Sequence, residues 1–182
     1  FLHSLGGYLA HSTDNIIISS FVSISVVGLY SNYTLITSYI NTLILQIQNS
    51  FSASVGNLIA PETPDPVYRV FRTVFLLHFT IVSIPTIVLA NITNPFIEWW
   101  LGSEYLLDTA TLVVILLNFF IFGMRTSAQI FKVKSGIFVQ DRFSPLIQGV
   151  INLVLSLVFV QFWDITGVLL GTTVSVLSVG FW

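Results

Sequence analysis

The sequence predicts an all-α protein, a bundle of six helices that cross a membrane. Two observations lead to this prediction. Of the 182 residues, 54% are hydrophobic and only 8% are charged, whereas soluble domains carry about 25% charged residues. The apolar residues also come in runs of about 20, long enough as helices to cover the ~30 Å hydrocarbon core of a bilayer. Lipid is therefore the expected solvent for most of the chain.

Six apolar segments meet this length requirement, and residues that favour turns separate them. In chain order they cover residues 2–27, 31–54, 68–93, 106–131, 144–163 and 165–182. The five breaks contain, in order, Gly28 with Ser31 and Asn32; Pro61, Pro64 and Pro66; Pro95 and Gly102; Gly136 with Pro145; and Asp164 with Gly167. Residues 95–102 are too short to span, and their Trp pair suits a half-turn at headgroup depth. We expect one domain, residues 1–182.

All Lys and Arg residues fall at two of the five connections. They are Arg69 and Arg72 at the second connection, and Arg125, Lys132, Lys134 and Arg142 at the fourth. Loops rich in Lys and Arg stay in the cytoplasm, so we expect both connections and residue 1 on the cytoplasmic side. The outer aromatic belt then consists of Trp99, Trp100, Tyr105 and Trp163.

Several kinds of chemistry are excluded by what the sequence lacks. There is no Cys for disulfide or thiol chemistry, no Walker loop for ATP, and no His, Glu or Cys cluster at metal-ligand spacing. A net charge of −2 does not indicate nucleic acid. We expect a protein that is not an enzyme, without cofactor or metal. Because the chain starts without Met and stops within an apolar segment, we also expect an internal fragment of a longer membrane protein.

Asp14 is the strongest candidate for a functional residue. It lies about midway along the first apolar run, where a carboxylate costs roughly 3 kcal/mol on insertion scales. His11 and Asn15 lie within one helical turn of it, on or next to the same face. We hypothesise that Asp14 lines a central cavity and takes part in cation or proton coupling. The alternative is that these polar groups satisfy one another at a buried helix contact.

Further polar residues recur at helical spacing on other predicted helices. Asn41 and Gln48 share a face of the second helix, and Asn152 lies on the fifth between Gln148 and Ser156; cavity lining and interhelical bonding are both open for these two helices. On the sixth, Gly167, Gly171 and Ser175 form a ridge that favours close packing. On the third, Pro85 predicts a kink, and His78 is interpreted as a packing residue.

The fourth predicted helix carries Asn118 and Arg125 on one face. Arg125 lies near the cytoplasmic boundary, where it either extends to lipid headgroups or binds an anion. In the second case it would act with Lys132, Lys134 and Arg142 to attract an anionic lipid-linked substrate, since the guanidinium fork matches phosphate.

Read in order, several segments resemble one known family. They are STDNIIIS (12–19), VGLYSNYTLI (27–36), SASVGNLIA (52–60), PFIEWWLGSEYLL (95–107), NFFIFGMR (118–125), SGIFVQDRFSPLIQGVINLVLS (135–156) and GVLLGTTVSVLS (167–178). This ordered set is similar to the bacterial polysaccharide transporter family, the Wzx-type flippases of lipid-linked oligosaccharides. That family belongs to a superfamily with multidrug exporters and lipid II flippases.

The resemblance implies an architecture and an activity. Family members have two six-helix lobes around a central cavity plus two extra helices, and this chain matches the second lobe. By alternating access, they would move an undecaprenyl-diphosphate-linked sugar unit across the bacterial cytoplasmic membrane for surface polysaccharide synthesis. The implied partners are this substrate, the bilayer and the N-terminal lobe, with a polysaccharide polymerase left open. The match at charged positions falls on Asp14, Arg125, Asp141 and Arg142.

Other functions stay open from the residues alone. One is a multidrug or small-cation exporter of the same superfamily. Another is a polyprenyl-dependent membrane glycosyltransferase or polymerase, although the short loops leave little room for catalytic residues. A purely structural membrane subunit is the third, and the polar stripes on several helices argue against it.

Overall fold

The computed structural model describes residues 13–59, 64–134 and 143–179. Within these ranges the predicted all-α class is confirmed, because every regular element is helical. After a helical segment at residues 13–21, the elements are α2 (Ile24–Ile59), α3 (Pro64–Trp100), the short 3-10 helix η1 (Ser103–Tyr105), α4 (Thr109–Lys134) and α5 (Ser144–Val179).

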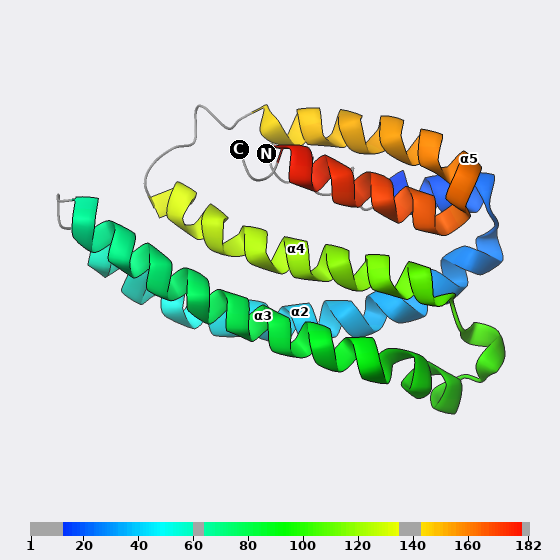
Figure 1. Ribbon diagram of the computed structural model, residues 1–182, viewed down its shortest axis with the longest axis horizontal. Helices are drawn as coiled ribbons and strands as arrows, with labels where there is room; N and C mark the ends of the chain where they lie inside the picture. Colours follow the sequence, from blue (N-terminus) through cyan, green and yellow to red (C-terminus); the bar gives the residue numbers. More distant parts are fainter. Residues whose placement is uncertain (1–12, 60–63, 135–142, 180–182) are drawn as a thin grey trace.

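The long helices lie side by side and alternate in direction (Figure 1). α5 is a hairpin of two arms, because Trp163 and Asp164 have non-helical backbone angles and Asp164 has a φ of 47°. This turn coincides with the predicted break after residue 163. It lies at the same end of the bundle as the linker between α3 and α4, whereas the start of α3 and the end of α4 lie at the opposite end (Figure 1).

Three segments of the described chain are long and apolar enough to cross a membrane. They are Phe71–Trp100, Thr109–Thr126 and Ser144–Val179. The structure is therefore that of a membrane protein in composition and length, but it does not confirm six spanning helices. The segment at 13–21 is short within the described range, and the hydroxyl and amide side chains along α2 lower the mean hydropathy of that helix.

The predicted first break is wrong. Gly28, Ser31 and Asn32 lie inside α2, and the chain instead turns at Val22 and Ser23. The Ser23 hydroxyl accepts a hydrogen bond from the Val26 N–H at 3.2 Å, which caps the start of α2. Inside α2, the Ser31 hydroxyl donates to the Val27 carbonyl, so a residue that favours turns is satisfied within the helix.

The predicted break at Pro95 is also wrong, because α3 continues through Pro85 and Pro95 to Trp100. Proline is tolerated in membrane helices, where neighbouring groups can replace the lost backbone hydrogen bond. The chain turns at Gly102, whose φ of 112° suits glycine. α4 then begins directly after Asp108. The Asp108 carboxylate caps this helix by accepting a hydrogen bond from the Thr111 N–H at 3.2 Å.

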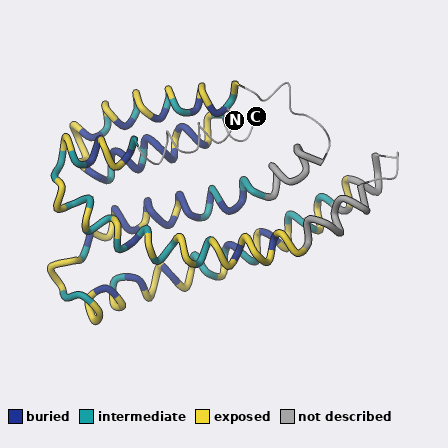
Figure 2. Tube along the Cα trace, turned by 180° about the vertical axis from the view of Figure 1, so that it is seen from behind, coloured by how far each residue is buried: buried dark blue, intermediate teal, exposed yellow. Residues whose placement is uncertain are grey.

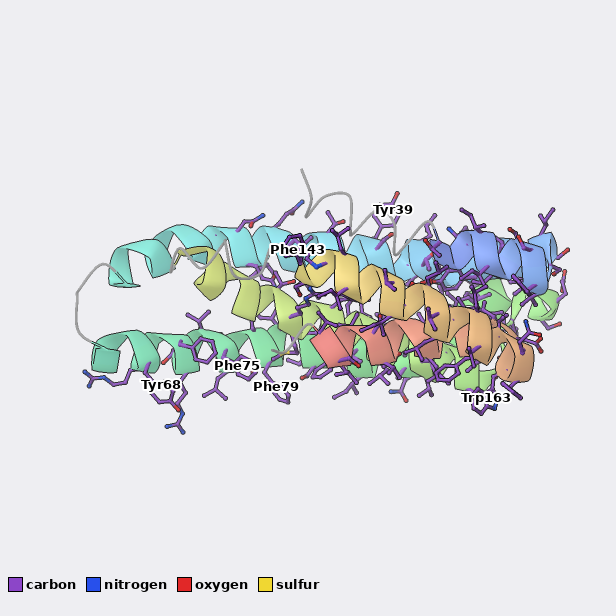
Figure 3. All side chains as sticks on the ribbon, turned by 90° about the horizontal axis from the view of Figure 1, so that it is seen from above. Tyr39, Tyr68, Phe75, Phe79, Phe143 and Trp163 are labelled. Atoms are coloured by element: carbon purple, nitrogen blue, oxygen red, sulfur yellow. The ribbon has the colours of Figure 1, made fainter. Side chains whose placement is uncertain are left out.

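α4 is the central helix, packed against α2, α3 and α5, and much of it is buried (Figure 2). Gly123 of α4 meets the Val82 side chain of α3 closely, and the Phe79 and Phe120 rings meet edge to face at 6.0 Å. Large side chains such as Tyr39, Tyr68 and Trp163 extend outward from the bundle (Figure 3). This distribution suits a protein that is surrounded by lipid.

Tyr33 joins three elements at the end of the bundle that contains Trp163. The side chain is fully buried, and its hydroxyl donates to Asn94 Oδ1 at 2.8 Å and accepts from the Leu107 N–H at 2.9 Å. It therefore ties α2 to α3 and to the linker that precedes α4.

Candidate functional site: a polar cavity among the helices

A cavity of about 490 Å³ lies among the 13–21 segment, α2, α4 and the second arm of α5. Hydroxyl, amide and charged groups share its wall with aromatic rings. The lining residues are Asp14, Tyr30, Thr34, Thr37, Ser38, Asn41, Leu45, Ile115, Asn118, Phe119, Phe122, Arg125, Thr126, Leu169 and Thr172. Four predicted site residues, namely Asp14, Asn41, Asn118 and Arg125, are thus brought to one cavity.

Asp14 forms the charged part of a buried polar network. Only 4% of the residue is exposed, and Oδ2 accepts a hydrogen bond from the Thr172 hydroxyl at 2.9 Å. The Thr172 oxygen accepts in turn from Asn152 Nδ2 at 2.8 Å. Asp14 Oδ1 and Asn152 Oδ1 are buried and have no hydrogen-bond donor among the described residues. Of these two residues only Asp14 lines the cavity, and its carboxylate can accept a proton, a cation or a donor group.

The neighbours of Asp14 explain why its side chain faces inward. Ile17 and Ile18, three and four residues further along, are buried in the core, so Asp14 shares their face of the helix. Asn15 and Ser20 are exposed on the other side. The polar residue predicted to accompany Asp14 therefore lies outside the cavity, and His11 lies outside the described residues.

α2 contributes a polar row to the cavity. Thr34, Thr37, Ser38 and Asn41 follow one another at spacings of three, one and three residues and line it together, as neighbours on one helix face do. The predicted Gln48 is buried further along α2 but does not line the cavity, and neither amide atom of its side chain has a partner among the described residues.

α4 and α5 are joined by polar bonds at intervals of seven residues along α4. The Thr111 and Thr166 hydroxyls lie 2.6 Å apart. Asn118 donates to the Leu169 carbonyl at 3.0 Å and accepts from Thr173 at 2.8 Å. Arg125 Nη1 donates to Gln148 Oε1 at 2.7 Å. Both Asn118 and Arg125 therefore line the cavity and also bond to α5.

The predicted anion-binding group is described only in part. Arg125 lines the cavity, roughly 10 Å along α4 from Asn118 by the helical rise. Arg69 and Arg72 are exposed near the start of α3, toward the same end of the bundle. Arg142 lies outside the described residues, and of Lys132 and Lys134 only the helical backbone is described.

Several residues at the site are not among the predicted site residues. Thr172 bridges Asp14 and Asn152, and Gln148 holds Arg125. A signal was present, since Gln148, Asn152 and Ser156 recur every four residues and all three are buried. The structure shows interhelical bonds for this row: Ser156 donates to the Val168 carbonyl at 3.1 Å.

The cavity brings hydroxyl, amide and charged side chains together inside an apolar bundle. In the described part of the chain, no three His, Cys, Asp or Glu residues gather as metal ligands. Comparisons with models of known families, with curated proteins and with solved structures found no significant match for this chain.

Proposed function

We propose that this chain is a transmembrane lobe of a flippase for lipid-linked oligosaccharides in the bacterial cytoplasmic membrane. Its substrate would be a polyprenyl-diphosphate-linked sugar unit for surface polysaccharide synthesis, and a second lobe would complete the path. The observation that carries the proposal is the cavity itself, because a carboxylate and a guanidinium are costly to keep within an apolar bundle.

The lining suits an amphiphile with an anionic, sugar-bearing head. Arg125 can donate two parallel hydrogen bonds to a phosphate, while the hydroxyl and amide groups of α2 can bond to sugar hydroxyls. Tyr30, Phe119 and Phe122 offer ring surface in the same cavity. The described arginines belong to the first part of α3 and the second half of α4. The start of α3 and the end of α4 lie at one end of the bundle (Figure 1), which supports entry of an anionic head from that end.

Asp14 would couple this movement to a cation or a proton. Asp14 Oδ1, which has no hydrogen-bond donor among the described residues, provides the acceptor that either would need. A drug or small-cation exporter is the second candidate, and the same Asp14 carboxylate favours it because it could bind a cationic substrate directly.

The test uses the protein encoded by the full reading frame, reconstituted in vesicles. A fluorescent undecaprenyl-diphosphate-linked sugar is supplied, and a membrane-impermeant quencher reports how much reaches the opposite leaflet. Transfer should exceed that of empty vesicles and depend on an ion or pH gradient. Transport of lipophilic cations without transfer of this lipid would favour the exporter.

Asp14→Asn is expected to lower the gradient-dependent rate about 10- to 100-fold, the loss of a charge-assisted interaction of about 1.5–3 kcal/mol. Glu98→Gln removes the same charge from an exposed site outside the cavity and should leave the rate unchanged. An Asp14→Asn protein with the parental rate and ion dependence would exclude the coupling role.

A further inference from the structure

The hydrogen bond between Arg125 and Gln148 connects the cavity to the start of the α5 hairpin. Arg125 lines the cavity and Gln148 does not. Gln148 is only 8% exposed, and its Oε1 accepts from Arg125 Nη1 at 2.7 Å. A ligand in the cavity would therefore contact the Arg125 guanidinium, whereas Gln148 accepts a hydrogen bond from the same guanidinium outside the cavity.

The bonds between α4 and α5 differ in which arm they hold. Thr111 and Asn118 bond to the second arm, through Thr166, Thr173 and the Leu169 carbonyl. Arg125 bonds to the first arm, one turn after α5 begins at Ser144. By the helical rise, Arg125 lies roughly 20 Å along α4 from Thr111. The Arg125–Gln148 bond thus holds the first arm, whereas the other two attachments hold the second, and the nearer of these lies roughly 10 Å away along α4.

We propose that this bond is a latch between α4 and the first arm of α5 that an anionic diphosphate in the cavity opens. The proposal rests on the anionic substrate of the proposed function. Gln148 is a positioning residue, because it orients Arg125 toward the cavity until the ligand arrives.

The chemistry of the two acceptors explains why the latch opens. Gln148 offers Arg125 one neutral amide oxygen, whereas a phosphate offers two charged oxygens in a geometry that matches the guanidinium. Charge-assisted bonds are about twice as strong as neutral ones. Once the diphosphate binds the Arg125 guanidinium, the buried Gln148 side chain has lost its hydrogen-bond donor, which costs free energy. The first arm relieves this cost by moving so that Gln148 reaches the cavity or water.

Binding of inorganic pyrophosphate to the full-length protein in uncharged-lipid nanodiscs tests the exchange of partners. Gln148→Leu removes the competing acceptor and should tighten binding by up to about fivefold, the equivalent of one neutral hydrogen bond. Gln148→Glu supplies a permanent competing anion and should weaken binding at least about tenfold. Gln161→Glu, an exposed change on the same arm, should match the parent. Equal affinity in all four proteins would overturn the latch.

Movement is measured separately, by the distance between spin labels at Tyr68→Cys on α3 and Ile147→Cys on α5. Both residues are exposed, and the 182 residues contain no native Cys, so only Cys residues elsewhere in the full-length protein have to be replaced before labelling. Pyrophosphate and farnesyl diphosphate should lengthen the distance, and farnesol should not. In the Gln148→Leu variant the distance between the labels should already be longer without ligand. In the Gln148→Glu variant pyrophosphate should lengthen this distance less than in the parent. An unchanged distance in the parent with saturating pyrophosphate would refute the latch even if a variant fails to fold.

The two proposals can fail separately. If the oligosaccharide lipid is not transferred but pyrophosphate still lengthens the distance, the flippase assignment is wrong and the latch stands. If transfer occurs but the distance stays constant, the latch is wrong. Nanodiscs that contain an anionic phospholipid show whether a phosphate of the bilayer, rather than the free diphosphate, opens the latch. A longer distance between the labels with that lipid alone, and no change with pyrophosphate, would contradict the proposal.

Discussion

Gly171→Ala should destabilise the protein by forcing the two arms of α5 apart. A Cβ placed on Gly171 would lie 2.7 Å from the backbone nitrogen of Ser156 and 2.9 Å from its Cα. Carbon atoms in contact are normally about 3.5–4.0 Å apart, so the arms must separate locally by roughly 0.6–1 Å. Backbone atoms cannot turn aside as a flexible side chain would.

The expected loss of stability is the balance of two destabilising effects and one stabilising effect. Overpacking costs about 1–3 kcal/mol. The shift also strains the bond between Asn152 and Thr172 and the bond from Ser156 to the Val168 carbonyl, each worth about 0.6 kcal/mol in a membrane. Alanine gains about 1 kcal/mol over glycine from helix propensity. The net expectation is a loss of about 1–3 kcal/mol in the free energy of unfolding.

Gly149→Ala is the matched control. Gly149 lies on the first arm, and the added Cβ would meet no other described part of the chain within 4 Å beyond the helix's own backbone, so only the propensity gain should remain, about 0.5–1 kcal/mol. Unfolding of the reconstituted protein by increasing SDS, followed by circular dichroism, measures both variants. If Gly171→Ala is as stable as Gly149→Ala, the close approach of the two arms is wrong.

Two further predictions concern single hydroxyl groups. Tyr33→Phe should lower the free energy of unfolding by about 1–3 kcal/mol, because it leaves the buried Leu107 N–H without an acceptor. Hydrogen exchange at Leu107 should accelerate as well. The control is Tyr39→Phe, on a residue that is 68% exposed, and it should change neither the stability nor the exchange rate. Ser23→Ala should cost about 1 kcal/mol through the lost cap of α2, measured in the same SDS titration; parental stability would show that the cap contributes nothing.

Composition and hydrophobic periodicity were enough to predict the helical class, since apolar runs of this length have few other ways to satisfy their backbone. Helix ends were harder, because serine, glycine and proline favour turns in water but are tolerated inside membrane helices. Ser23 caps a helix while Ser31 lies within one, and the local sequence does not distinguish them. Asp164 was identifiable as a break because it is a charged residue between two apolar runs.

Several residues of the site could be predicted from the sequence, but the hydrogen bonds between them could not. Asp14, Asn118 and Arg125 were selected because each is a polar group in an apolar run, and all three line the cavity. Asn15 was selected on the same ground and is exposed, because its orientation depends on which face Ile17 and Ile18 bury. The bond between Asp14 and Thr172 joins residues 158 positions apart, and no local pattern encodes such a pairing.

That separation also fixes an order of events during biosynthesis. A chain grows at about 5–20 residues per second, so Thr172 is made roughly 8–32 s after Asp14. The helical segment that contains Asp14 is therefore made well before its partner exists. The arms of α5, in contrast, are joined by Asn152 and Thr172, only 20 residues apart, and can form as soon as they are made. The bond from Thr172 to Asp14 can therefore form only after the α5 hairpin has turned at Asp164.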